Sequence, residues 1–354
     1  MSMIAPAPSL ALRDAFDAGA DYLATCTVGI TPRRTRDALI ADAEGSAAGL
    51  ADPVAYGAAT ERARAHFAAL VGTAPTRVAI GSQTSAFTAL IAAALPAGAE
   101  VLVPEGDFSS LLLPFAHAPQ GLRVRAVPLA ALADAIGPGT ALVAFSLVQS
   151  ATGEVADLPA ITEAARRHGA RTLCDGAQAV GWMPVDATQV DALVCHAYKW
   201  LCAPRGVAFL AISEEFARQV PALHAGWYAG ADPWTSCYGH TTPLADDATR
   251  LDVSPAWSAF LGAEQSLALF ASADQQASLA HTTGLAAAFR DAIGVAEPSI
   301  ASAIVTWPDT DGQALLRLSA AGIAASGRAG RARVGFHVYN DESDVERAVR
   351  ALRG

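Results

Sequence analysis

Short apolar runs, each bounded by polar, glycine or proline positions, alternate along this chain with longer amphipathic stretches. Such runs are typical of strands that are buried on both faces of a sheet. We expect strands over residues 77–81, 100–103, 123–127, 141–148, 172–174, 192–195 and 206–212. We expect helices over residues 8–20, 31–39, 60–70, 85–94 and 159–168. The alternation of strand and helix from residue 77 to residue 212 predicts an α/β fold with a mostly parallel sheet.

The pattern changes after residue 253, where helices come first and strands are fewer. We expect helices over residues 256–271, 275–292, 315–321 and 343–352, and strands over residues 302–307 and 331–338. This order predicts a smaller α+β C-terminal domain over residues 254–354, beside a large domain over residues 21–253. The first 20 residues are expected to pack against the small domain.

Composition narrows the class of protein. The chain has 354 residues, of which 52% are hydrophobic, so a large core is available. A net charge of -10 argues against nucleic acid or an anionic membrane as the main partner. Residues 78–99 carry no charge, but Gly81 and Pro96 interrupt them, which favours a strand, a turn and a buried helix over a membrane span.

The N-terminus and the cysteines indicate a cytoplasmic protein. Residues 1–14 lack the basic region of a signal peptide. The five cysteines are odd in number and show neither metal-ligand nor disulfide spacing, so we expect no metal site.

Candidate chemistry gathers at the ends of two expected strands. Asp175 ends the first, with Gln178 three residues on, and His196, Tyr198 and Lys199 follow the second. Pyridoxal 5'-phosphate (PLP) needs a lysine for its aldehyde and a carboxylate for its ring nitrogen. Asp175 could also be a turn residue and Lys199 a surface lysine, but their combination at strand ends favours the PLP interpretation.

Two further stretches have open interpretations. The turn at residues 81–84 precedes a helix, whose N-terminus could bind a phosphate or could simply be capped. Residues 224–234 are rich in aromatic side chains, Trp227 among them, with glycine and proline spacing that indicates a loop. This loop could contact substrate or a partner subunit, or it could be pinned to the core by its own aromatics.

The strand-end motifs resemble those of class V aminotransferase-fold PLP enzymes, such as cysteine desulfurases, selenocysteine lyases, kynureninases and isopenicillin N epimerases. Residues 175–181 match D-x-A-Q-x-x-G, and residues 196–206 match S-x-(H/Y)-K-x-x-x-G-P-x-G apart from His196 and Ala203. The resemblance implies the PLP-dependent transferase fold of type I, with Lys199 and Asp175 catalytic. Tyr198 is similar to a phosphate-contacting tyrosine of kynureninase.

The same resemblance implies further cofactor contacts. It places Gln83 and Thr84 at the phosphate, Phe108 against the pyridine ring, and Ser150 near the 3-oxygen, to which Gln178 could also donate. His196, in place of the family's serine, is a further expected cofactor contact. Phe108 could instead be a core residue that opens a helix. Ser254 falls where the family contacts the phosphate of a neighbouring subunit, which implies a homodimer with shared active sites.

Substrate contacts follow from the resemblance as well. Arg333 falls on the arginine that binds the substrate α-carboxylate, and a guanidinium suits a carboxylate bidentately. Cys26 lies in a segment that passes the active-site mouth, and Trp257 and Trp227 are expected nearby.

The reaction type stays open at this point. We favour a lyase acting at the β-carbon of an L-amino acid, because no cysteine follows Cys237 to accept sulfur as in a desulfurase. An aminotransferase is the second interpretation and an epimerase the third. A non-enzymatic binding protein of the same fold is a further alternative, motivated by the substitutions at Ser150, His196 and Ala203. An NAD-binding protein is disfavoured, since no G-x-G-x-x-G follows a strand.

Overall fold

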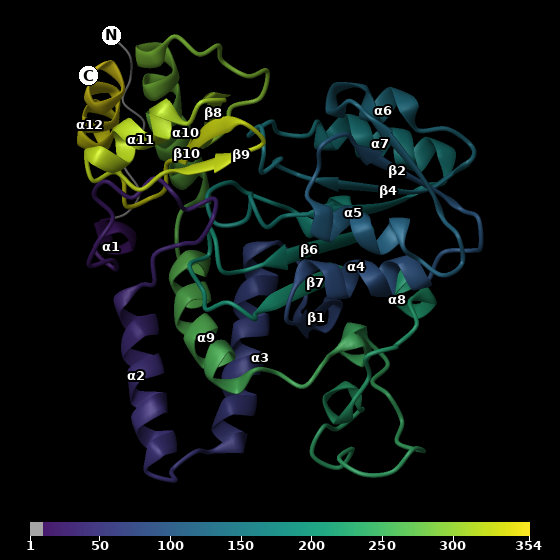
Figure 1. Cartoon of the computed structure of the whole chain (residues 1–354). Helices are drawn as coiled ribbons and strands as arrows, with labels where there is room; N and C mark the ends of the chain where they lie inside the picture. The colour runs from purple at the N-terminus through teal and green to yellow at the C-terminus, as the bar shows by residue number, and fades with distance from the viewer. Residues whose placement is uncertain (1–9) are drawn as a thin grey trace.

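The computed structural model describes residues 10–354, which form two β-sheets and the helices that cover them (Figure 1). The larger sheet has seven strands in the order β1-β7-β6-β5-β4-β2-β3. Its strands are β1 (Val78–Gly81), β2 (Glu100–Pro104), β3 (Arg123–Val127), β4 (Thr140–Ser146), β5 (Arg171–Asp175), β6 (Ala192–His196) and β7 (Ala208–Ile212). Pairing is parallel from β3 across to β6, and β7 runs antiparallel to both β6 and β1. The mostly parallel sheet expected from the sequence is confirmed.

Helices cover both faces of this sheet, and each face has its own hydrophobic cluster. On one face lie α4 (Thr84–Ala93), α5 (Ser109–Ala116) and α8 (Glu214–Gln219). On the other face lie α3 (Pro53–Leu70), α6 (Leu132–Ala135), α7 (Leu158–His168) and α9 (Trp257–Ala271). Since both faces are covered, the strands read as continuous apolar runs.

The smaller sheet has three antiparallel strands in the order β8-β10-β9. Its strands are β8 (Ile304–Pro308), β9 (Ser326–Arg328) and β10 (Arg331–Gly335). The helices α10 (Gln275–Ile293), α11 (Gln313–Ala320) and α12 (Glu342–Arg353) pack on it. Tyr22 and Ala24 form isolated bridges with Ala324 and Gly335, so the N-terminal segment runs along this sheet. The domain boundary at residues 253 and 254 stays a prediction.

Several expected element ends differ from the structure for local reasons. The helix expected over residues 8–20 is only α1 (Leu10–Arg13) in the described residues, and residues 8 and 9 lie outside them. The second helix, α2 (Arg33–Ala47), begins after Pro32, which occupies the cap position in place of Thr31. α3 begins well before residue 60, because the Asp52 carboxylate accepts the amides of Val54 and Ala55.

The end of the chain's last strand also differs from expectation. β10 ends at Gly335 rather than continuing to residue 338, because His337 and Asn340 close a turn. In that turn the His337 amide donates to Asn340 Oδ1 at 2.9 Å.

The uncharged stretch at residues 78–99 is resolved as β1, a turn and the buried helix α4, as expected. Within the described residues, every helix is too short or too polar to cross a bilayer.

Candidate active site

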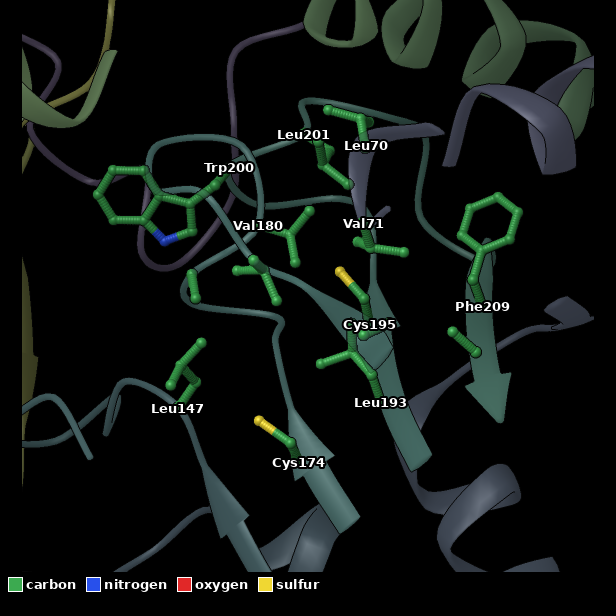
Figure 2. Close-up of a cluster of buried hydrophobic side chains, with 14 of the residues drawn as sticks. Leu70, Val71, Leu147, Cys174, Val180, Leu193, Cys195, Trp200, Leu201 and Phe209 are labelled. Atoms are coloured by element: carbon green, nitrogen blue, oxygen red, sulfur yellow. The ribbon is translucent and has the colours of Figure 1, made fainter. Parts of the chain in front are cut away.

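Lys199 lies in the turn that follows β6, and its main chain is fixed from several directions. The Gly29 amide donates to the Tyr198 carbonyl at 2.9 Å, and the Cys202 amide donates to the Lys199 carbonyl at 3.1 Å. Cys202 adopts a left-handed backbone with φ of 53°, which tightens the turn. Figure 2 shows Trp200 and Leu201, the two residues after Lys199, at the hydrophobic cluster that rests on β5, β6 and β7.

The Lys199 side chain is buried beside two aromatic rings. Its Nζ lies 5.2 Å from the ring centre of Phe108 and 5.6 Å from that of Tyr198. Burial lowers the pKa of Lys199, and the charge of Asp175 opposes part of this effect. A lowered pKa increases the fraction of neutral amine, the form that attacks a carbonyl carbon.

Lys199 is also the only lysine in the whole sequence. All the other basic side chains in the count of 24 lysines and arginines are arginines. A single lysine in a chain that otherwise uses arginine indicates a specific need for a primary amine at residue 199, independently of the motif.

Asp175 ends β5 with its carboxylate in the protein interior. Oδ1 accepts the Ala177 amide at 2.8 Å. Burial raises the pKa of Asp175 to about 6, against the lowering effects of that amide and of Lys199. Among residues 10–354 this carboxylate has no ion-pair partner, so a cationic ligand group would relieve an unpaired buried charge.

Gln178 is held in one orientation by two neighbours. The Trp200 indole donates to Oε1 at 2.7 Å, and Nε2 donates to the Cys26 carbonyl at 2.9 Å. An indole nitrogen only donates, so the amide orientation follows from this bond. The second Nε2 hydrogen has no partner in the described structure and is available to an acceptor such as a phenolic oxygen.

His196 and Tyr198 meet edge to face, with ring centres 4.4 Å apart. His196 Nε2 is buried, and no described residue is its hydrogen-bond partner. Burial lowers the pKa of His196 to about 4, with Lys199 and Arg205 adding to the effect, so the ring is neutral at pH 7. A neutral imidazole can donate one hydrogen bond to an anion.

The register of the sheet brings the start of α4 toward His196. Gly81 pairs with Ala208 of β7, and Ala208 pairs with His196. Thr84, the first residue of α4, is buried, while Gln83 is exposed at the cap position and makes no side-chain cap. The uncapped amides of this helix start suit a phosphate.

Arg333 of β10 is buried and connects three segments. Nε donates to Ser326 Oγ at 3.1 Å, Nη2 donates to Thr27 Oγ1 at 2.9 Å, and Nη1 donates to the Ser150 carbonyl. A guanidinium has five N–H donors, so these three bonds leave two for a carboxylate. Ser150 therefore contributes its main-chain carbonyl, and the predicted role of its hydroxyl stays a prediction. Cys26 lies beside the site, because its thiol is 3.9 Å from Ser326 Oγ, the hydroxyl that also accepts from Arg333, and its carbonyl accepts from Gln178.

Three of the predicted residues, Ser254, Trp227 and Trp257, make their described contacts with residues other than Lys199. The Trp227 indole donates to Ser254 Oγ at 3.2 Å, and Trp257 stacks on Tyr56 with ring centres 5.3 Å apart. Within residues 10–354, no hydrogen bond, ion pair or ring contact joins Ser254, Trp227 or Trp257 to Lys199. Their roles in substrate or cofactor binding stay predictions.

The structure brings to the site several residues that the sequence did not predict. Thr27 and Ser326 hold Arg333, and Trp200 holds Gln178. Their types are common, so only the three-dimensional contacts reveal them. Asp107, buried one residue before Phe108, was missed although an acidic side chain after an apolar run is a recognisable signal.

The described residues fit PLP. The site offers a buried unpaired carboxylate, a desolvated lysine, an unpartnered histidine nitrogen near an uncapped helix start, and free guanidinium donors. The fold and the site together are those of a PLP-dependent enzyme. The pattern that defines the Aminotransferase class-V family matches residues 53–299, and the chain belongs to that family.

Curated relatives agree with this family. An isopenicillin N epimerase from Amycolatopsis lactamdurans is 34% identical over 43% of this chain and 44% of its own length. A kynureninase from Stenotrophomonas maltophilia is 37% identical over 36% of this chain and 28% of its own length. The chain thus aligns with less than half the length of either relative.

A solved structure extends the likeness of fold to nearly the whole chain. A cystine C-S lyase, determined with its reaction product cysteine persulfide, superposes with a TM-score of 0.84 at 20% identity. The match covers 95% of this chain and 97% of that structure. At 20% identity this match supports a common fold and nothing about the reaction.

Proposed function

We propose that this protein is a PLP-dependent lyase that acts at the β-carbon of an L-amino acid. The observation that carries the proposal is the arrangement of three buried side chains, Lys199, Asp175 and Arg333. They offer a desolvated amine, a carboxylate without an ion-pair partner in the described residues, and two unused N–H donors. PLP, when bound, supplies an electron sink for a carbanion at the substrate α-carbon. Arg333 binds the substrate carboxylate through its two free N–H groups.

Lys199 then acts as the base that removes the α-proton. Its lowered pKa suits this role, because a base works best when its pKa lies near the operating pH. Asp175 would hold the ring nitrogen of the cofactor in its protonated form. The electron pair released at the α-carbon would expel a leaving group from the β-carbon together with its bonding electrons. With one water consumed, the net products would be the released group, a 2-oxo acid and ammonia.

The distribution of thiols supports release of the leaving group rather than its capture by the enzyme. Cys26, beside the site, is buried, as are Cys174, Cys195 and Cys202, and burial raises the pKa of the last three thiols. The sequence has no cysteine after Cys237, so the region of β8 to α12 offers no sulfur acceptor. A solved protein of similar fold is described as a cystine C-S lyase, which is in keeping with this class of reaction.

Because Lys199 is the only lysine, trapping of the cofactor gives an unusually clean test. We expect purified protein with PLP to absorb at roughly 410–430 nm, as lysine-bound PLP does. Borohydride reduction should then attach one pyridoxyl group, located at residue 199 by peptide mass mapping. Lys199→Ala should lose both the band and the label, and Arg218→Ala, an exposed cation on α8, should keep both.

The reaction type is tested with a panel of L-amino acids bearing a β-leaving group. A lyase releases a 2-oxo acid and ammonia without any added amino acceptor. Stoichiometric transfer of the amino group to a 2-oxo acid would establish an aminotransferase instead. Conversion of L- to D-amino acid on a chiral column would establish an epimerase, the activity named for the relative from Amycolatopsis lactamdurans. A protein that neither binds PLP nor changes any of these substrates would contradict an enzymatic role.

We also propose a cytoplasmic homodimer with shared active sites, in which Ser254, Trp227 and Trp257 serve the neighbouring subunit. Ser254 is exposed, as are Trp234 and Tyr238 of the adjoining loop. Mixing Lys199→Ala with Ser254→Trp protein tests the sharing. If the sites are shared, hybrid dimers regain activity that neither variant has alone, whereas unshared sites give no recovery.

A further inference from the structure

Asp107 is a buried carboxylate at the site to which the chemistry above gives no role. It lies between β2 and α5, and its side chain is 9% exposed. Its oxygens accept three hydrogen bonds, from the Ser146 amide at 2.8 Å, the Ser146 hydroxyl at 2.5 Å and the Phe108 amide at 2.6 Å. Burial raises the pKa of Asp107, and these bonds oppose the effect.

The sheet register places this carboxylate beside Asp175. Ser146, which donates two bonds to Asp107, is the register partner of Asp175 on the neighbouring parallel strand. Adjacent strands lie about 4.8 Å apart, so the two carboxylates flank a single strand end. The charge of Asp107 adds to burial in raising the pKa of Asp175.

Among the described residues, neither carboxylate of this pair forms an ion pair. Lys199 is the one described cation whose charge acts on Asp175, and Cys174 and Cys195 are buried thiols nearby. Two like charges at one buried edge are costly, and the cost falls when a cation binds between or beside them.

We propose that Asp107 is a positioning residue with two effects. Its carboxylate accepts the Phe108 backbone amide and so fixes Phe108, and it adds a second negative charge beside that of Asp175. The inference rests on the proposed function, because the cation that the pair would hold is the protonated ring nitrogen of PLP. Phe108 is the residue whose ring centre lies 5.2 Å from Lys199 Nζ. One carboxylate thus orients the ring-stacking side chain and favours the protonated form of the ring.

Three variants separate the charge of Asp107 from its hydrogen bonds. Asp107→Asn removes the charge at nearly constant volume, and Ser146→Ala removes one hydrogen bond and keeps the charge. Asp134→Asn changes the net charge equally at an exposed position of α6 and serves as the control. The readout is the pH midpoint of the visible absorbance band of PLP-loaded protein.

We expect Asp107→Asn to lower this midpoint by about one pH unit, a tenfold change in proton affinity. The direction follows because loss of a nearby negative charge destabilises the protonated form of the lysine-bound cofactor. Ser146→Ala and Asp134→Asn should stay close to wild type. An unchanged midpoint in Asp107→Asn, or an equal shift in Ser146→Ala, would overturn the charge role.

The apo protein gives a second readout that needs no cofactor. A raised carboxyl pKa means that the folded state binds more protons than the unfolded state between about pH 4 and pH 6, so its contribution to stability is lost as pH rises. In Asp107→Asn this loss of melting temperature across the window should be smaller than in wild type, and in Asp134→Asn it should not change. Equal pH dependence in all proteins would contradict an acidic pair. Failure of wild type to bind PLP would instead refute the proposed function, and the apo comparison would still test the pair.

Discussion

Gly29 packs so closely against Lys199 that a Cβ atom on this glycine would lie 2.1 Å from the Lys199 carbonyl oxygen. The same Cβ would lie 2.8 Å from Cys202 Sγ. The N-terminal segment therefore fixes the main chain of the lysine turn by direct contact, in addition to its hydrogen bond to the Tyr198 carbonyl.

Gly29→Ala is expected to displace the lysine turn and to weaken PLP binding at least tenfold. Overpacking of this kind costs about 1–3 kcal/mol of stability. Titration of apo protein with PLP and urea unfolding measure the two effects. Gly45→Ala is the matched control, because a Cβ on this helical glycine of α2 meets nothing within 4 Å. It should bind PLP normally and be stabilised by up to about 1 kcal/mol; equal behaviour of the two variants would refute the contact.

Arg333→Lys should reduce kcat/KM for amino acids about 100-fold, chiefly through KM. A lysine keeps the charge but lacks the fork that binds both carboxylate oxygens while holding Thr27 and Ser326. Steady-state kinetics with the best substrate of the panel measures the loss. Arg328→Lys, on the neighbouring strand at an exposed position, should stay within twofold of wild type. A KM unchanged by Arg333→Lys would exclude this arginine from carboxylate binding.

Asp252→Asn should destabilise the fold by about 3–5 kcal/mol, as expected when one partner of a buried ion pair is lost. Arg64 Nη2 lies 2.6 Å from Asp252 Oδ2, and both side chains are buried. Asp252 also accepts the Ile80 amide at 2.7 Å, so it ties β1 to the segment that leads to Ser254.

Glu163→Gln provides the comparison for this ion pair. Glu163 and Arg166 form an exposed pair on α7, and we expect its loss to cost less than about 1 kcal/mol. Chemical denaturation measures the free energy of unfolding of both variants. A similarly small decrease in both would show that the Arg64–Asp252 pair is not needed for stability.

His337 should contribute a loss of stability as pH falls from about 6.5 to 4, opposite in sign to the contribution of the buried carboxyl groups whose pKa is raised. This side chain is fully buried, and burial lowers its pKa to about 4. The unfolded chain binds the proton more tightly in this window, so unfolding gains roughly 3 kcal/mol from this one group. Melting temperatures of wild type and His337→Gln between about pH 6.5 and 4 test the effect, and the melting temperature of the variant should depend less on pH. The same pH dependence in both proteins would assign the loss of stability to other groups.

The sequence predicted the fold well because most of its strands are buried on both faces and its helices alternate with them. Asp175, His196 and Lys199 could be identified because they lie at strand ends, within a few residues of an apolar run. Arg333 was identified by motif, but its partners Thr27 and Ser326 come from distant segments that no periodicity connects. Helix starts were less predictable, since Pro32 and Asp52 set them through cap geometry rather than through hydrophobic spacing.

Arg333 has a consequence for which molecules the site admits. Its described bonds are to two hydroxyls and one carbonyl, none of which carries a negative charge. Within residues 10–354 no ion pair neutralises this buried cation, and under the proposed function the substrate carboxylate would be the compensating anion. If Arg333 binds the substrate as proposed, free amines such as decarboxylated amino acids would leave that charge unbalanced, and the site would favour ligands that carry a carboxylate whatever their side chain.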